Sequence, residues 1–171
     1  VLLCGESGSG KTTFSRLVNG LIPNYYEGTL TGKVRVEDKN PEEVELHELA
    51  PYVGSVFQNP KAQFYTLITD TEIVFACENM GMDCGEILRR FDTTVTAMHL
   101  ESLIGRNLFT LSGGEKQKIA CASVHALQPD VLVLDEPTSN LDIGTIHELE
   151  NILRLWKALG KTVIVAEHRL D

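Results

Sequence analysis

The stretch that decides the fold is CGESGSGKTTF, Cys4–Phe14, at the start of the chain. Within it, Gly5–Thr12 matches the pattern G-x-x-x-x-G-K-[ST] in full. The apolar run Val1–Cys4 precedes the loop and a helical pattern over residues 11–19 follows it, so we expect strand, loop and helix in that order. A flexible turn is the alternative, but the flanking strand and helix favour a loop that binds phosphate.

The composition of this loop suits a nucleoside triphosphate. Glycines let backbone N–H groups converge on phosphate oxygens, because side chains there would block the approach. The helix N-terminus adds partial positive charge, Lys11 reaches the β- and γ-phosphates, and the Thr12 hydroxyl is a ligand for Mg²⁺. The dinucleotide pattern G-x-G-x-x-G fails, because Thr13 stands where its third glycine is required. The residues that we predict to bind nucleotide here are Gly5, Glu6, Ser7, Gly8, Ser9, Gly10, Lys11, Thr12 and Thr13.

A second motif, VLVLDEP, Val131–Pro137, ends a buried strand with two adjacent carboxylates. Open α/β sheets bind their ligands at the carboxyl ends of such strands. Asp135 is predicted to hold Mg²⁺, directly or through water, and Glu136 to orient and deprotonate the attacking water. The alternative is a pair of carboxylates that face solvent, but the phosphate loop in the same chain favours hydrolysis.

A third motif, LSGGEKQ, Leu111–Gln117, opens another helix with a serine and two glycines. A hydroxyl and free N–H groups at a helix start form an anion site, although an ordinary N-cap followed by a loose turn is the alternative. Two helix starts suited to phosphate in one small domain require two phosphates, or two copies of the domain that share them.

Strands alternate with helices along the chain, which is typical of an α/β fold with a parallel sheet. The segments Gly32–Asp38 and Pro51–Gln58 are expected to form a small antiparallel sheet beside the parallel core. The other expected elements are a helical insert over residues 71–99 with a break at 81–85, a helix over 143–159 and a strand over 162–167.

Composition limits the partners and the compartment. The chain has 171 residues and 43% hydrophobic content, which suits one domain with a packed core. Its formal charge of −9 argues against nucleic acid as a partner, and it contains no apolar run of membrane-spanning length. We expect four reduced cysteines that serve as small core residues, and three cations that are simply solvated: Cys4, Cys77, Cys84, Cys121, Lys61, Arg89 and Arg90.

In order, these motifs resemble the nucleotide-binding domain of an ATP-binding cassette (ABC) protein over essentially all 171 residues. The resemblance implies a P-loop NTPase with a parallel core sheet, a small antiparallel β part and a helical subdomain at about residues 70–126 that carries the signature. Strand-like sequence at both ends leads us to expect a domain, 1–171, that is truncated on both sides. The matching motifs are Walker A (Gly5–Thr12), the Q-loop (Gln58), the signature (Leu111–Glu115), Walker B (Val131–Glu136), the D-loop (Ser139–Asp142) and the switch histidine (His168).

The resemblance also implies roles for these residues with ATP and Mg²⁺. Gln58 would touch Mg²⁺ and the attacking water, and His168 would contact the γ-phosphate, although from sequence alone His168 could be a surface histidine. Two such domains pair head to tail, so the signature of one copy would complete the phosphate site of the other. The implied nucleotide contacts from these parts are Ser112, Gly113, Gly114, Glu115 and Asp142. Glu115 departs from the glutamine of many members, and the adenine-stacking aromatic residue would precede residue 1.

The segment VFQNPKAQFYTLITDTEIVFACENMGM, Val56–Met82, together with NGLIP and AEHRLD, resembles the ATPases of energy-coupling factor importers, including the cobalt type. These importers take up vitamins or transition-metal ions. The resemblance implies a second ABC ATPase domain, the same or different, a transmembrane coupling subunit and a membrane substrate-binding subunit. It also implies a cytoplasmic, peripheral location on the inner face of the cell membrane. Residues 58–78 would receive a coupling helix, unless EIVFACENM, Glu72–Met80, faces its own core.

Three other classes compete with this interpretation. A soluble ABC ATPase of chromosome organisation or repair would carry a long coiled coil between Walker A and the signature, which the short separation excludes. A translation-related ABC ATPase stays open as the alternative. A P-loop kinase has no reason to contain LSGGE. A binding module without hydrolysis is disfavoured because Lys11, Asp135, Glu136 and His168 are all present.

Overall fold

The computed structural model describes residues 1–139 and 141–168. It divides into two compact units, which are described separately. The first unit comprises Val1–Gln58, Pro129–Pro137 and the C-terminal segment from Trp156, and the second comprises Asn59–Gln128 and Thr138–Leu155. Among the described residues, no helix combines the length and the apolar character needed to cross a membrane.

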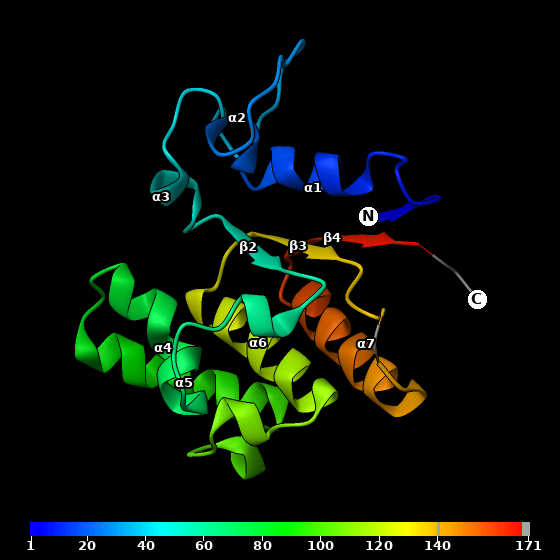
Figure 1. Ribbon diagram of the computed structural model, residues 1–171. Helices are drawn as coiled ribbons and strands as arrows, with labels where there is room; N and C mark the ends of the chain where they lie inside the picture. Colours follow the sequence, from blue (N-terminus) through cyan, green and yellow to red (C-terminus); the bar gives the residue numbers. More distant parts are fainter. Residues whose placement is uncertain (140, 169–171) are drawn as a thin grey trace. The chain divides into compact units, whose positions relative to one another are not determined.

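The first unit contains a parallel four-stranded sheet, as predicted (Figure 1). Its strands are β1 (Leu2–Cys4), β2 (Val53–Val56), β3 (Val131–Asp135) and β4 (Thr162–Glu167), in the order β1-β4-β3-β2. β3 lies in the interior of the sheet, and its residues from Val131 to Leu134 are all buried. This burial explains the uninterrupted apolar run, because strands covered on both faces need no polar alternation.

Helix α1 (Lys11–Val18) lies along this sheet (Figure 1), and the short helices α2 (Leu21–Asn24) and α3 (Leu46–Leu49) follow it. Burial of aliphatic side chains between α1, the loops and the strands stabilises the unit. The residues of this core are Val18, Val36, Val53, Val131, Val133 and Ile164, with Leu3 and Tyr52 packed against them. The core holds the start of α1 beside the carboxyl ends of the strands.

The expectation of a small second sheet is wrong in the residues that the structure describes. β2 joins the parallel sheet instead, where Val53–Val56 pairs with Val131–Leu134 and is largely buried. In the segment 32–38, Val36 pairs only with Lys39, through N–H···O bonds of 2.9 and 3.1 Å. Glu37 occupies the left-handed region between them, with φ of 53°. A tight turn therefore replaces the expected strand, because the buried Val36 is anchored by packing and not by a ladder.

The second unit is helical, and α6 (Gly113–Leu127) is its most buried helix (Figure 1). Helices α4 (Thr69–Asn79) and α5 (Cys84–Met98) pack against α6, on which Ala120, Ala122 and Ala126 are fully buried. Small side chains let neighbouring helices approach closely. The remaining elements are the 3-10 helices Pro60–Ala62, Glu101–Leu103 and Leu108–Thr110, and helix α7 (Ile143–Ala158), which belongs to this unit as far as Leu155.

Arg90 corrects the expectation of a solvated charge. Its guanidinium donates to the backbone oxygens of Ala126 and Leu127, at 3.1 and 2.6 Å, and its side chain is only 16% exposed. It therefore satisfies carbonyl groups that the end of α6 leaves without intrahelical partners. Arg89 remains exposed, as expected, and hydrogen bonds from Arg89 and, second, from Arg90 lower the pKa of Glu86 to about 2.

Two of the four cysteines are buried and two are exposed. Cys77 and Cys121 are buried, as predicted for small core residues, and burial raises the pKa of both thiols, that of Cys121 to about 12. Cys4 and Cys84 are exposed, so the expectation of a core role is wrong for them. All four are free thiols.

Candidate functional site

The glycine-rich loop adopts a conformation that only glycine accepts readily. Gly8 and Gly10 have φ of 82° and 94°, in the left-handed region, and a Cβ at either position would meet no described atom within 4 Å. The glycines are thus required by backbone geometry and leave the concave side of the loop open. No described side chain caps the start of α1 at Gly10. The N–H groups of its first turn therefore suit an anion.

Lys11 places a positive charge inside this loop. The residue is buried, and its Nζ donates to the backbone oxygens of Gly5 and Glu6, at 2.6 and 2.9 Å. Both acceptors are neutral backbone groups, so neither contact balances the charge of Lys11. A phosphate group would supply one, and the donor set of ammonium and N–H groups fits a polyphosphate.

The predicted metal ligands Thr12 and Asp135 lie together. The Thr12 hydroxyl, on α1, donates to Oδ1 of Asp135, at the end of β3, at 3.3 Å. A hydroxyl and a carboxylate are hard oxygen ligands that suit Mg²⁺. The residues present therefore fit the predicted ion, with its remaining ligands to come from water and phosphate oxygens.

The structure also brings Gln58 to Glu136. Nε2 of Gln58, which follows β2, donates to Oε2 of Glu136 at 3.0 Å. Glu136 has φ of 45° and its N–H donates to the backbone oxygen of Ala166 at 2.8 Å. Positive φ at a residue other than glycine is uncommon, and such strain gathers at functional sites. Both side chains sit at the carboxyl edge of the sheet beside Asp135.

His168 lies at the glycine-rich loop, directly after β4. The N–H of Ser7 donates to Nε2 of His168 at 3.1 Å. Nε2 is thus the unprotonated nitrogen, which places the proton of the neutral ring on Nδ1. The structure therefore brings together the predicted residues Ser7, Lys11, Thr12, Gln58, Asp135, Glu136 and His168 within the first unit.

Sequence reasoning missed the polar residues behind this edge. A cavity of about 190 Å³ is lined by Thr12 and Asp135 together with Ser15, Asn19 and Ser55. The Ser15 hydroxyl is buried and has no hydrogen-bond partner within residues 1–139 and 141–168. None of the sequence motifs includes these three residues. In the sequence alone, the serine on α1 cannot be told from an ordinary polar residue of a helix.

The signature segment begins α6 in the second unit, as predicted. Oγ of Ser112 accepts the N–H of Glu115 at 3.2 Å, and the N–H of Ser112 donates to Oε2 of Glu115 at 2.7 Å. This capping box satisfies two donors at the helix start. The bond from Ser112 and the ion pair with Arg106, 2.7 Å long, hold the pKa of Glu115 below its ordinary value. Glu115, which stands where many family members have glutamine, therefore hydrogen-bonds within the start of its own helix.

The two signature glycines differ in their surroundings. A Cβ at Gly113 would meet no described atom within 4 Å, whereas one at Gly114 would lie 2.5 Å from Oγ1 of Thr145. Thr145 is held in turn by Asp142, whose carboxylate accepts its N–H and its hydroxyl, both at 3.0 Å. These bonds lower the pKa of Asp142. Asp142 thus caps the start of α7. Asn140 of the predicted D-loop lies outside the described residues.

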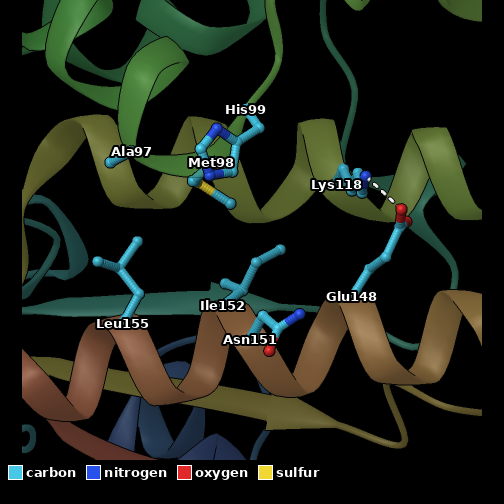
Figure 2. A pocket seen from close by; sticks show the side chains of 8 residues that line it. All are labelled: Ala97, Met98, His99, Lys118, Glu148, Asn151, Ile152 and Leu155. Carbon is cyan, nitrogen blue, oxygen red and sulfur yellow. Dashed lines mark ion pairs between the residues drawn. The ribbon is translucent and has the colours of Figure 1, made fainter.

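The second unit also contains a hollow of about 380 Å³ (Figure 2). Its apolar lining comes from Ala97, Met98, Ile152 and Leu155. The ion pair of Lys118 with Glu148, 2.8 Å long, crosses one end of it. Its polar lining is completed by His99 and Asn151. The residues that line it include none of the predicted site residues.

Comparison with known proteins gives consistent matches. Residues 1–139 match the family model described as ABC transporter. A protein of Treponema denticola, provisionally named an ABC transporter ATP-binding protein, is 49% identical over 170 residues, which is 99% of this chain and 35% of that protein. A Pyrococcus abyssi protein with the same provisional description is 42% identical, over 99% of this chain and 61% of its own length.

A solved structure gives the same result. CbiO1 from Clostridium perfringens, described as part of the ABC transporter complex CbiONQ, has a TM-score of 0.86 and 30% identity. The match covers 98% of this chain and 66% of that one. This chain spans about a third of the length of most of the curated relatives compared, as in the 35% of the Treponema denticola protein.

Proposed function

This chain belongs to the ABC transporter family as an ATP-binding domain, and from that premise we propose that it hydrolyses ATP to power an importer of the energy-coupling factor type. The observation that carries the ATPase proposal is the gathering of Lys11, Thr12, Asp135, Gln58 and Glu136 in one unit. Lys11 and the loop N–H groups suit the phosphates, Thr12 and Asp135 suit Mg²⁺, and Glu136 supplies a base.

Each side chain has a distinct role in this proposal. Lys11 would exchange its bonds to Gly5 and Glu6 for bonds to the β- and γ-phosphates. Bound Mg²⁺ would neutralise part of the phosphate charge, with Thr12 and Asp135 as its protein ligands. Glu136 would accept a proton from the attacking water.

Gln58 and His168 would orient the reaction. Gln58 already contacts the Glu136 carboxylate and would hold it toward the attacking water. His168 accepts the N–H of Ser7, so its Nδ1–H is the donor left for an oxygen of the terminal phosphate.

We further propose that the domain, 1–171 with a helical subdomain at about 70–126, works as one of a pair. At the start of α6 the capping box engages the N–H groups of Ser112 and Glu115, and Gly113 between them borders open space. The phosphate residues described above are all in the other unit. A second ABC ATPase domain, identical or not, would present its own Ser112, Gly113 and Gly114 equivalents to the ATP bound here, and ATP would hold the pair closed until hydrolysis.

The similarity to CbiO1 supports membrane partners for this chain. On the second unit, Tyr65 and Leu67 are 76% and 60% exposed, and the Tyr65 ring stacks on Phe75 with centroids 5.0 Å apart. Exposed apolar side chains in a group indicate a contact surface. The alternative that α4 faces its own core holds for Ile73 and Cys77, which are fully buried. We propose that Tyr65, Leu67 and Phe75 receive a coupling helix of a transmembrane subunit at the cytoplasmic face of the membrane.

Affinity purification of the full-length protein from detergent-solubilised membranes tests the importer assignment. Mass spectrometry should find a transmembrane coupling subunit and a small membrane protein that binds a vitamin or a transition-metal ion. Substitution of Leu67 by Asp should remove both from the sample, while the exposed change Leu88→Asp on α5 should not. Recovery of ribosomes or other soluble complexes in place of membrane proteins would leave the ATPase and refute the importer.

A further inference from the structure

We propose that Arg106 is a positioning residue that links the segment before α4 to Ser112 of the signature, through Glu115. This inference rests on the proposed function, in which Ser112 serves ATP held by a second domain. Arg106 lies between the two parts in sequence, and none of the motifs includes it. All of its partners named below belong to the second unit.

The guanidinium of Arg106 fixes the carboxylate of Glu115. Nη1 of Arg106 lies 2.7 Å from Oε1 of Glu115, while Oε2 accepts the N–H of Ser112 at 2.7 Å. Each oxygen thus has a separate partner, and rotation of the carboxylate would break one bond to keep the other. The side chains of Arg106 and Glu115 are 38% and 31% exposed, so solvent screens the pair only in part.

The backbone of Arg106 is tied to the first turn of α4. Its carbonyl accepts the N–H of Thr69 at 3.0 Å, and its N–H donates to Oγ1 of Thr69 at 3.3 Å. Thr69 is fully buried, and its hydroxyl donates to the backbone oxygen of Leu103 at 2.8 Å. The carboxylate of Asp70 accepts the N–H of Gly105 at 2.6 Å. Residues 105 and 106 therefore cannot move independently of α4.

The same pairing continues into the exposed segment. The N–H of Leu108 donates to the carbonyl of Leu67 at 2.9 Å, and Ile68 forms an antiparallel bridge with Asn107. A displacement of Leu67 or Ile68 would carry residues 106–108 with it, because backbone hydrogen bonds join the two segments. The Arg106 guanidinium would then move relative to the Glu115 carboxylate, and the hydrogen bond from the Ser112 N–H to that carboxylate would weaken. A partner that presses on residues 65–68 thereby controls the geometry of the signature.

The test uses the full-length protein with Arg106→Ala, Arg106→Lys, Glu115→Gln and the double variant Arg106→Ala with Glu115→Gln. Arg89→Ala is the matched control, because Arg89 forms an exposed ion pair with Glu86 on another helix of the same unit. Amide hydrogen exchange at residues 112–115 reports the capping, and ATP affinity and turnover at saturating ATP report the site.

We expect Arg106→Ala to speed exchange at these amides by about 10-fold and to lower turnover by a similar factor, with ATP affinity within about twofold of wild type. Arg106→Lys should restore part of the amide protection and part of the turnover, because lysine keeps the positive charge but lacks the planar guanidinium. The double variant should lose no more than Arg106→Ala alone. Thr69→Val should also speed exchange at residues 112–115, whereas Thr93→Val, which removes an exposed hydroxyl on α5, should not.

Wild-type exchange at residues 112–115 in Arg106→Ala would overturn the link, as would losses in the double variant that are the sum of the two single losses. Equal effects of Arg106→Ala and Arg89→Ala would also overturn it, because they would indicate general destabilisation. A wild-type protein without ATPase activity would refute the proposed function alone, since the exchange rates need no hydrolysis and would still decide the link.

Discussion

Adding a methyl group at Gly114 should destabilise the protein, whereas the same change at the adjacent Gly113 should not. A Cβ at Gly114 would lie 2.5 Å from Oγ1, 2.7 Å from Cγ2 and 3.2 Å from Cβ of Thr145. A Cβ at Gly113 would meet no described atom within 4 Å beyond its chain neighbours and the backbone of its own helix. Both glycines are in the first turn of α6, so replacement by alanine brings the same gain in helix propensity to each.

The difference between the two variants therefore isolates the clash. Thr145 cannot rotate away freely, because its hydroxyl donates to Asp142 at 3.0 Å. Overpacking of this kind costs about 1–3 kcal/mol, so Gly114→Ala should be less stable than Gly113→Ala by that amount. With a urea m-value of about 2 kcal/mol per molar, the midpoint of unfolding would fall by about 0.5–1.5 M.

Urea unfolding followed by circular dichroism is the assay, with both single variants and the pair Gly114→Ala with Thr145→Ala. Removal of Oγ1 and Cγ2 of Thr145 should make the added methyl group nearly neutral in that background. Equal midpoints for Gly113→Ala and Gly114→Ala, or a clash cost that persists without the Thr145 side-chain atoms, would refute the packing argument.

Two further predictions concern charge and one concerns the helix end. Lys11→Ala should weaken ATP binding by at least 10-fold in a titration with a fluorescent nucleotide, because the loop loses its ammonium group; unchanged affinity would contradict the phosphate-loop assignment. Asp142→Ala should lower the urea midpoint more at pH 7 than at pH 3. The depressed pKa of Asp142 means that its stabilisation is present above the ordinary value of 3.8 and disappears as pH falls through the lower folded value; an equal loss at both pH values would count against this. Arg90→Ala should lower the midpoint more than Arg89→Ala, since only Arg90 satisfies carbonyls at the end of α6.

The parallel sheet could be predicted because its strands carry a clear signal. The runs 131–134 and 163–166 are apolar and alternate with helical patterns, which is typical of strands in a parallel sheet. The prediction that Pro51–Gln58 belongs to a separate sheet was wrong, because the periodicity of one strand does not show which other strand it pairs with. Val53 packs in one core with Val18 of α1 and with Val131 and Val133 of β3, and this tertiary packing decides the partner of β2.

The site was predictable where backbone geometry demands a residue type. Left-handed φ at Gly8 and Gly10 explains why glycines occur there, and their spacing was readable. The contacts of Arg90 and Arg106 were not, because a long side chain reaches partners far away in sequence and its own neighbours give no sign of them. Glu115 shows the same limit, since its capping role was readable from the serine three residues earlier but its ion pair was not.

In the proposed mechanism Glu136, held by Gln58, is the base for hydrolysis of ATP bound at Lys11. Phosphate release by the full-length protein, measured for wild type and Glu136→Gln beside ATP affinity for both, tests it most directly. In Glu136→Gln, turnover should fall by about 10²-fold or more while affinity stays within about threefold, because the amide keeps the shape of the side chain and loses only its basicity. Undiminished turnover in Glu136→Gln would exclude Glu136 as the base.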